Sequence, residues 1–208
     1  VLVGSVQTSS EAHHVAVSGD HAYVADWIAG LQVVDIRVPT TPKIVGSVDT
    51  PGTALGVTIS NDLAYVADAE SGLQVIDIRS PRNPEIIGYA DTPGTAFDVA
   101  ISGDFAFVAD YGSGLQVIDI SVPESPVLVA SVNSPVSAEG VVIYGIYAYV
   151  SYYDFGMQVI DVSTPESPNV MGSINTPGYS RGIDVSRDCV YLAGGDAGIQ
   201  ILYRQCDN

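Results

Sequence analysis

The sequence predicts an all-β protein, a five-bladed β-propeller with four antiparallel strands in each blade. Three observations support this prediction. One motif recurs with a constant step of 42 residues, as from Gly30 to Gly72; each repeat contains four short β-type segments; and the first residues of the chain match a strand that the last repeat lacks. Repeats of about 40–45 residues with four strands each are typical of propeller blades.

The recurring motif is a strand that begins after a glycine. It reads GLQVVDI at Gly30–Ile36, GLQVIDI at Gly72–Ile78 and at Gly114–Ile120, GMQVIDV at Gly156–Val162, and GIQIL at Gly198–Leu202. Each glycine follows the previous one by the same step, so the repeats align without a gap. The chain therefore consists of five similar units.

One repeat predicts four strands, which we name A to D: Ala54–Ser60, Leu63–Ala67, Leu73–Arg79 and Glu85–Ala90. These segments are rich in β-branched and aromatic residues, and turn residues separate them. Pro81 and Pro84 lie between strands C and D, where the missing N–H of proline suits a loop.

The two ends of the chain predict how the propeller closes. Val1–Val6 reads VLVGSV and matches the D strand KIVGSV at Lys43–Val48, whereas the fifth repeat stops after its C strand. We therefore expect residues 1–8 to pair with the blade of residues 180–204, so that the ring is closed and has no free edge. Residues 1–208 then form a single domain. Because the chain begins without Met, we also expect it to be a processed or excised segment.

The motif resembles the LVIVD repeat family, through Gly72–Ile78 and the segment Ala64–Ala67 ahead of it. The resemblance covers essentially the whole chain. It implies a bacterial or archaeal cell-surface or secreted protein that acts as a binding or scaffold module. It implies no catalytic residue, because the shared residues occupy strand and turn positions. The fifth unit departs from the family pattern, with Leu202 and Tyr203 where Asp and Ile are usual.

The charge balance excludes two classes of partner. The chain has 24 Asp and Glu against 7 Lys and Arg, a net charge of −17, and Lys43 is its only lysine. Such a surface repels nucleic acids and anionic membranes, and no apolar run is long enough for a membrane-spanning helix. The acidity suits basic partners, cations or simple solubility.

Two sets of repeated aspartates are expected to be structural. Asp35, Asp77, Asp119 and Asp161 end the C strands, where their side chains can accept hydrogen bonds from nearby backbone N–H groups. Asp26, Asp68 and Asp110 stand at the turns between strands B and C and are expected to form those turns.

Residues that differ between repeats gather at the starts of the A strands and in the loops between strands B and C. Both should lie on one rim, at the mouth of the central channel. The second position of the A strand holds five different side chains: His13, Leu55, Phe97, Glu139 and Arg181. We predict a ligand-binding rim of Trp27, Phe97, Tyr111, Tyr153, Phe155, Arg181, His13 and Glu139. Aromatic rings of this kind stack on sugars or anchor protein partners.

Three functions remain open on this evidence. The first is a non-enzymatic extracellular binding or assembly module for a glycan or a protein, with self-assembly or membership of a larger surface protein as further options. The expected location is the extracellular space or the cell surface, with the periplasm as the alternative. The second is a polysaccharide hydrolase or lyase at the channel mouth, with Glu139, His13, Asp98 and Arg181 as catalytic residues. The third is a purely structural role, in which Trp27 covers a blade interface. Glu139 and Arg181 share a register in neighbouring repeats, which favours a plain ion pair.

No metal site or cofactor is predicted. The chain lacks an EF-hand loop, so a calcium ion at the channel mouth is the one cofactor that the acidity leaves open. Cys189 opens the last B strand and Cys206 follows the last C strand. These strands form a hairpin, so we predict a disulfide between the two cysteines, which places the protein outside the reducing cytosol.

Overall fold

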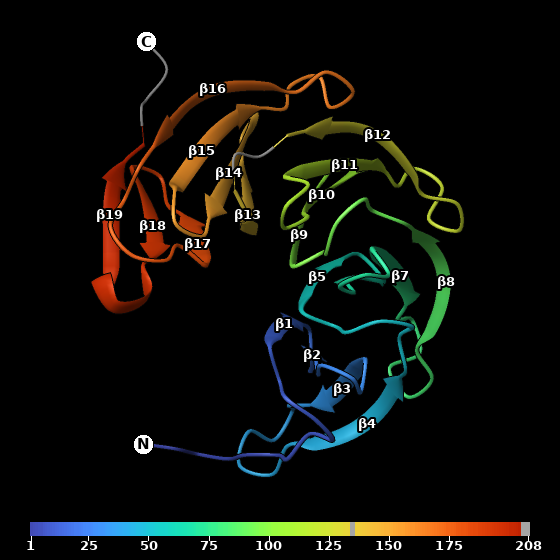
Figure 1. Cartoon of the computed structure of the whole chain (residues 1–208). Helices are drawn as coiled ribbons and strands as arrows, with labels where there is room; N and C mark the ends of the chain where they lie inside the picture. The colour runs from blue at the N-terminus through green and yellow to red at the C-terminus, as the bar shows by residue number, and fades with distance from the viewer. Residues whose placement is uncertain (134–135, 205–208) are drawn as a thin grey trace. The chain divides into compact units, whose positions relative to one another are not determined.

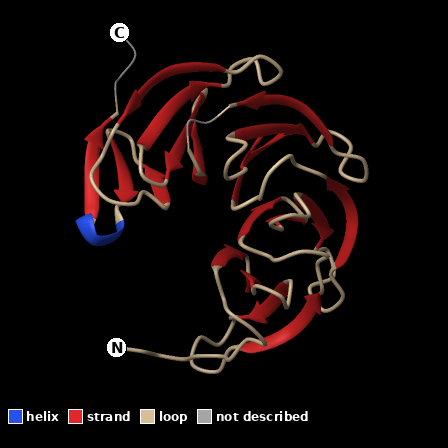
Figure 2. Cartoon of the chain, in the orientation of Figure 1, coloured by secondary structure: helices blue, strands red, loops and turns tan. Residues whose placement is uncertain are grey.

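The computed structural model describes residues 1–133 and 136–204. Within them the chain folds into antiparallel strands and one short 3₁₀ turn, η1 (Gly195–Ala197) (Figure 2). The described residues divide into two compact units. Residues 1–96 with 120–127 make the first unit, and the described residues of 97–119 and 128–204 make the second.

The first unit contains two four-stranded sheets, each ordered as its strands follow along the chain (Figure 1). One sheet consists of β1 (His14–Ser18), β2 (His21–Ala25), β3 (Leu31–Asp35) and β4 (Lys43–Val48). The other consists of β5 (Gly56–Ser60), β6 (Leu63–Ala67), β7 (Leu73–Asp77) and β8 (Glu85–Ala90).

The second unit contains the other three sheets. The first consists of β9 (Asp98–Ser102), β10 (Phe105–Ala109), β11 (Leu115–Asp119) and β12 (Val127–Val132). The next consists of β13 (Ala138–Tyr144), β14 (Tyr147–Tyr152), β15 (Gly156–Asp161) and β16 (Asn169–Ile174). The last consists of β17 (Gly182–Val185), β18 (Cys189–Ala193) and β19 (Ile199–Tyr203).

The predicted strands B and D of the second repeat match β6 and β8 at both ends. Strand A starts two residues later than expected, at Gly56, because Ala54 pairs instead with Trp27 of the preceding repeat. Strand C ends two residues earlier, at Asp77, because its carboxylate accepts a hydrogen bond from the N–H of Arg79 and turns the chain.

Neighbouring sheets within a unit pack against each other through apolar side chains, and inner strands such as β2, β6 and β10 are almost wholly buried. In the first unit, Leu31 and Val33 of β3 lie in one buried cluster with Val57, Val66 and Ile76 of the next sheet. In the second unit, Leu115 and Val117 of β11 lie in a cluster with Ile160 of β15. This arrangement explains why the strands are nearly continuous apolar runs rather than alternating ones.

The last sheet differs from the others in strand number. It has three strands, and the described residues Val1–His13 form no strand. The sequence predicted that residues 1–8 would be its fourth strand. The described residues contain no helix that is long and apolar enough to cross a membrane.

Candidate functional site

The loops between strands B and C are held by a backbone pair to the next sheet. Trp27, Ala69 and Tyr111 occupy the same position in three repeats and adopt positive φ angles of 53°, 47° and 42°. Trp27 exchanges backbone hydrogen bonds with Ala54, at N–O distances of 3.2 and 3.0 Å. Tyr111 does the same with Ala138. The side chain at this position is therefore set beside the start of the next A strand.

A buried aspartate precedes each of these three residues in the chain, at Asp26, Asp68 and Asp110. The carboxylate of Asp68 accepts hydrogen bonds from Thr50 Oγ1 at 2.5 Å and from the N–H of Gly52 at 2.8 Å. Burial raises the pKa of Asp68, and these two hydrogen bonds oppose the rise. Asp68 thus joins its turn to the connection that precedes strand A, which is a structural role as the sequence indicated.

The aspartates at the ends of the C strands are also structural, as predicted. Asp35, Asp77 and Asp161 each accept a hydrogen bond from the backbone N–H two residues later, at 3.0, 2.9 and 2.8 Å. The guanidinium of Arg37 beside Asp35 holds the pKa of that carboxyl well below its usual range.

In the first unit, the predicted residues His13 and Trp27 form one aromatic pair. Their rings stack with 4.7 Å between centroids and 18° between planes. Both side chains are exposed. Trp27 therefore contributes to the surface of the rim, while its backbone links two sheets.

In the second unit, an aromatic pair and a mixed cluster lie on consecutive repeats. Phe97 stacks on Tyr111 with 5.3 Å between ring centroids. The backbone of Tyr111 pairs with Ala138, the residue before Glu139. Glu139 Oε2 lies 3.7 Å from Arg181 Nε, so the ion pair expected from the sequence is present.

The cluster continues from Arg181 to two tyrosines. The guanidinium carbon of Arg181 lies 5.7 Å from the centroid of the Tyr153 ring, within the range of a cation–π contact. Tyr153 also stacks on Tyr179, with 4.3 Å between centroids and 14° between planes. We call Phe97, Tyr111, Glu139, Tyr153, Tyr179 and Arg181 the rim cluster.

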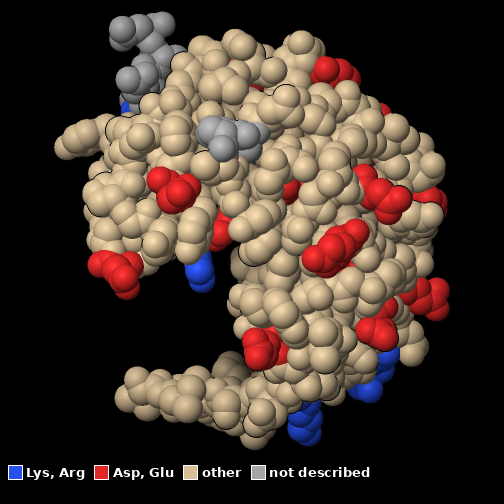
Figure 3. Space-filling view, viewed as in Figure 1, with Lys and Arg blue, Asp and Glu red and all other residues tan. Residues whose placement is uncertain are grey.

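The rim cluster combines exposed tyrosine rings with the partly buried carboxyl group of Glu139. Tyr111 is 43% exposed and Tyr179 is 47% exposed. Burial raises the pKa of Glu139, whereas the positive charge of Arg181 lowers it. Figure 3 shows acidic side chains scattered over one face of the molecule, and the sequence has 24 acidic against 7 basic residues, so Arg181 brings a positive charge to an acidic protein.

Two residues that the sequence placed at the site have other contacts. Phe155 is half-buried, packs against the core cluster of the second unit and makes an edge contact with Tyr152. The two carboxylate oxygens of Asp98 accept hydrogen bonds from the N–H groups of Val99 and Val141. Asp98 thus ties β9 to β13, and this use of both oxygens argues against a catalytic role.

Tyr179 was not predicted from the sequence, although the aligned repeats single out its position. The corresponding positions in the earlier repeats hold Glu11, Thr53, Thr95 and Ser137. A large ring at a position otherwise occupied by smaller polar residues marks a specialised repeat.

The described residues contain no group of three or more His, Cys, Asp or Glu side chains suited to a metal ion. Among the described residues, Cys189 has no disulfide partner, and it opposes Tyr203 across the hairpin. Cys206 lies outside the described residues, so the disulfide stays a prediction.

Solved structures with the same kind of fold are numerous but distant in sequence. The computationally designed Ika8 protein superimposes with a TM-score of 0.73 at 9% identity, over 91% of this chain and 57% of its own. A functionally unknown protein from Desulfotomaculum acetoxidans DSM 771 superimposes with a TM-score of 0.72 at 16% identity, over 90% of this chain and 64% of its own. The β-propeller domain of Myceliophteria thermophila Cps50 (Swd1) superimposes with a TM-score of 0.72 at 15% identity, over 90% of this chain and 68% of its own.

The present chain thus spans less than two thirds of the length of two of these structures. At such identities the likeness concerns the fold, which is propeller-like. A comparison with curated proteins found no match. The family model for the LVIVD repeat matches four times, at residues 10–50, 51–92, 93–134 and 136–176. These matches cover most of the sequence, and the chain therefore belongs to the LVIVD repeat family.

Proposed function

We propose that this protein is a non-enzymatic binding module whose rim cluster binds a glycan. The observation that carries the proposal is the stack of the exposed Tyr179 on the half-buried Tyr153, beside the ion pair of Glu139 and Arg181. Flat aromatic faces pack against the C–H faces of sugar rings. An adjacent carboxylate and guanidinium can accept and donate hydrogen bonds to sugar hydroxyl groups.

Hydrolysis of a polysaccharide is less well supported by the same residues. A hydrolase needs two carboxyl groups that are available to the substrate. Glu139 is paired with Arg181, and both oxygens of Asp98 are bound to backbone N–H groups. Binding without catalysis therefore fits the rim cluster better, with a protein partner as the alternative ligand.

The proposal includes a location and a finer architecture. We place the protein outside the cell or on its surface, consistent with its acidity and its two cysteines. We also propose a five-bladed propeller in which a strand from residues 1–8 completes the last blade, that of residues 180–204, and so closes the ring. The five sheets and the match of Val1–Val6 to the D strands support this architecture.

A glycan-array screen tests the proposed ligand class. The parent protein is compared with Tyr179→Ala and with Tyr153→Ala/Tyr179→Ala, and Tyr89→Ala serves as the control. Tyr89 is an exposed tyrosine on β8, in the first unit, and is not part of the rim cluster. We expect the parent and the control to bind the same glycans, and the rim variants to lose them at an unchanged melting temperature. Absence of glycan binding by the parent, or binding that survives in the double variant, contradicts the proposal.

A further inference from the structure

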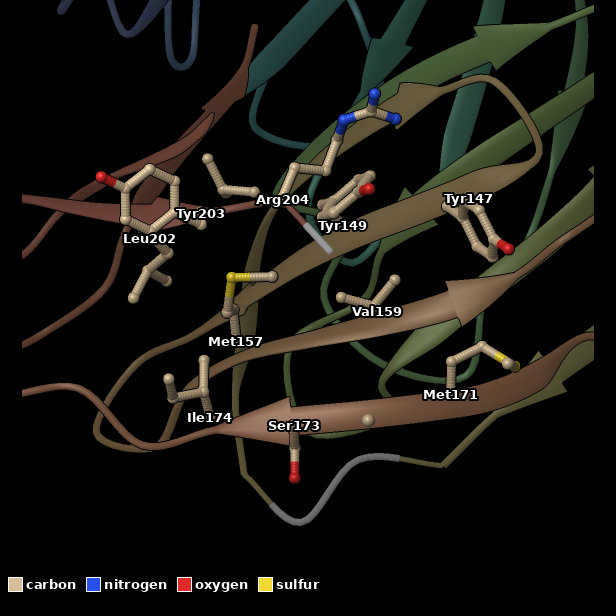
Figure 4. Close-up of a pocket in the computed structure, with 12 residues that line it drawn as sticks. Tyr147, Tyr149, Met157, Val159, Met171, Ser173, Ile174, Leu202, Tyr203 and Arg204 are labelled. Atoms are coloured by element: carbon tan, nitrogen blue, oxygen red, sulfur yellow. The ribbon is translucent and has the colours of Figure 1, made fainter. Parts of the chain in front are cut away.

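Each unit contains a groove, and the two grooves differ in chemistry. The groove of the second unit encloses about 390 Å³ and is mainly apolar, with walls that include Met157 and Leu202 (Figure 4). The groove of the first unit encloses about 400 Å³ and is lined mainly by charged and polar side chains. We call it the arginine groove, because its walls include Arg37, Arg79 and Arg82.

The arginine groove collects the positive charge of an otherwise acidic unit. The sequence of the first unit has four basic residues, and three of them are the arginines of this groove. The fourth, Lys43, pairs in β4 with Asp35, which also lines the groove. All basic side chains of the unit therefore belong to the groove or to a strand position beside it.

Backbone contacts hold Arg82 in the wall of the groove. The N–H of Asn83 donates to the carbonyl of Ser80 at 2.9 Å and closes a turn that contains Arg82. Gly46 of β4 packs against this turn, because a Cβ there would lie 2.2 Å from the carbonyl oxygen of Pro81 and 3.0 Å from the carbonyl carbon of Arg82. The first two sheets thus meet at this turn, and the position of Arg82 is fixed by both.

The three guanidinium groups keep N–H donors that no described residue uses. Nε and Nη2 of Arg37 donate to the carboxylate of Asp35, and the same groups of Arg79 donate to Asp77. Within residues 1–133 and 136–204, Nη1 of these two arginines has no hydrogen-bond partner, and the guanidinium of Arg82 has neither a hydrogen bond nor an ion pair. A carboxylate that orients an arginine and leaves donors unused reduces the entropy lost when an anion binds.

The next pair of repeats shows what the arginine groove lacks. Arg82 corresponds to Glu124, which occupies a turn closed by the same hydrogen bond. The pKa of Arg79 is raised, first by its hydrogen bonds to Asp77 and further by charges that include that of Glu124. The protein thus supplies its own anion at that place. In the arginine groove Arg37 has Arg82 in its place, so the balancing anion has to come from a ligand.

We propose that the arginine groove binds a tetrahedral oxyanion, a phosphate or sulfate group. Guanidinium groups bind such groups through paired N–H donors, and the hydroxyl of Ser80 in the wall adds another donor. A carboxylate has two oxygens, which one arginine satisfies. A phosphate or sulfate group has at least three oxygens available and engages all three arginines. This site does not depend on the proposed glycan site, because the rim cluster lies in the second unit.

Titration of the full chain with inorganic phosphate, followed by NMR at constant ionic strength, tests the site. We expect the Nε–H signals of Arg37, Arg79 and Arg82 to shift and to saturate. Arg82→Glu should weaken phosphate binding about tenfold or more. This variant is expected to fold, because Glu124 occupies the same position of an equivalent turn. Arg187→Glu is the matched control, since it makes the same change of charge at an exposed arginine of the second unit and should bind phosphate as the parent does.

Other anions identify the ligand class. Acetate, which is planar, should bind more weakly than phosphate or sulfate. Tighter binding of glucose 6-phosphate than of inorganic phosphate assigns the anion to a phosphorylated sugar, whereas equal or weaker binding assigns it to the free ion. Phosphate should also raise the melting temperature of the parent and not that of Arg82→Glu.

Three results overturn the proposal: a parent that binds neither phosphate nor sulfate, phosphate binding that survives in Arg82→Glu, and acetate that binds as tightly as phosphate. The melting temperature of Arg82→Glu without phosphate shows whether this variant is folded. Arg37→Ser, which introduces the residue found at Ser121 in the third repeat, is a second variant and should also weaken binding. Unchanged binding in Arg37→Ser likewise contradicts the site.

Discussion

The ring of Tyr179 stacks on the ring of Tyr153, with 4.3 Å between their centroids, and the guanidinium carbon of Arg181 lies 5.7 Å from that same Tyr153 ring. Tyr153 follows β14, whereas Tyr179 and Arg181 precede β17. The backbone also links these segments, because the N–H of Ser180 donates to the carbonyl of Tyr153 at 2.7 Å. The rim cluster is thus formed by consecutive repeats and is anchored through the main chain.

Removal of Arg181 should change the titration of Glu139. Burial raises the pKa of Glu139 and the charge of Arg181 lowers it, so Arg181→Ala should raise this pKa further. NMR titration of the glutamate side-chain carbon measures the change. Arg181→Lys, which keeps the charge, should restore most of the lower value. An unchanged titration in Arg181→Ala would show that the ion pair is absent in solution.

The raised pKa of Glu139 also predicts the direction of a pH effect on stability. A carboxyl with a raised folded-state pKa binds its proton more tightly in the folded chain than in the unfolded chain. Its stabilising contribution is complete below the unfolded pKa and is lost as the pH rises through the folded pKa. We therefore expect Arg181→Ala to melt below the parent, by a difference that grows as the pH rises from the unfolded to the folded pKa of Glu139. Thermal unfolding at a series of pH values measures it.

Replacement of Asp68 should destabilise the second sheet. In Asp68→Asn one oxygen can still accept the hydroxyl of Thr50, but the amide NH₂ then faces the N–H of Gly52. Loss of a buried hydrogen bond with an unsatisfied donor costs about 1–3 kcal/mol of unfolding free energy. Denaturant unfolding measures the loss, with Asp62→Asn at the exposed neighbouring turn as the control. Equal stability of the two variants would contradict the structural role of Asp68.

A methyl group at Gly46 should be poorly tolerated. Its Cβ would lie 2.2 Å from the carbonyl oxygen of Pro81, and backbone atoms cannot move aside as a flexible side chain can. We expect Gly46→Ala to lower the free energy of unfolding by about 1–3 kcal/mol. Gly182→Ala is the matched control in a strand, because its nearest contact is an ordinary 3.6 Å to the Cβ of Ala193. Similar melting temperatures for the two variants would count against this close approach.

The left-handed backbone at Ala69 predicts opposite effects for two substitutions. Ala69 has a φ of 47°, whereas Gly195 occupies the same position in the last repeat with a φ of 56°. Ala69→Gly should leave stability unchanged or raise it by up to about 1 kcal/mol, since glycine adopts this conformation without strain. Ala69→Val should lower stability, because branching at Cβ disfavours positive φ. Circular dichroism melting ranks the three proteins, and a valine variant as stable as the parent would contradict the assignment.

The sequence by itself determined the features that depend on local pattern. The step of 42 residues and the turn residues placed β6 and β8 at their observed ends, and the carboxylates of Asp35 and Asp77 were correctly expected to bind nearby backbone. These features follow from alternation, β-propensity and short-range hydrogen bonds, all of which act within a few residues along the chain.

The ion pair of Glu139 and Arg181 was expected from the sequence, but the tertiary structure alone decided the other side-chain contacts between repeats. Tyr179 belongs to the rim cluster because its ring stacks on Tyr153. Asp98 does not, because its carboxylate accepts a hydrogen bond from the N–H of Val141, 43 positions further along the chain. The beginning of strand A moved for the same reason, since Ala54 pairs with Trp27 of the preceding repeat. Such contacts depend on how neighbouring sheets pack. A repeat pattern places its residues in columns, but packing between repeats determines which columns touch.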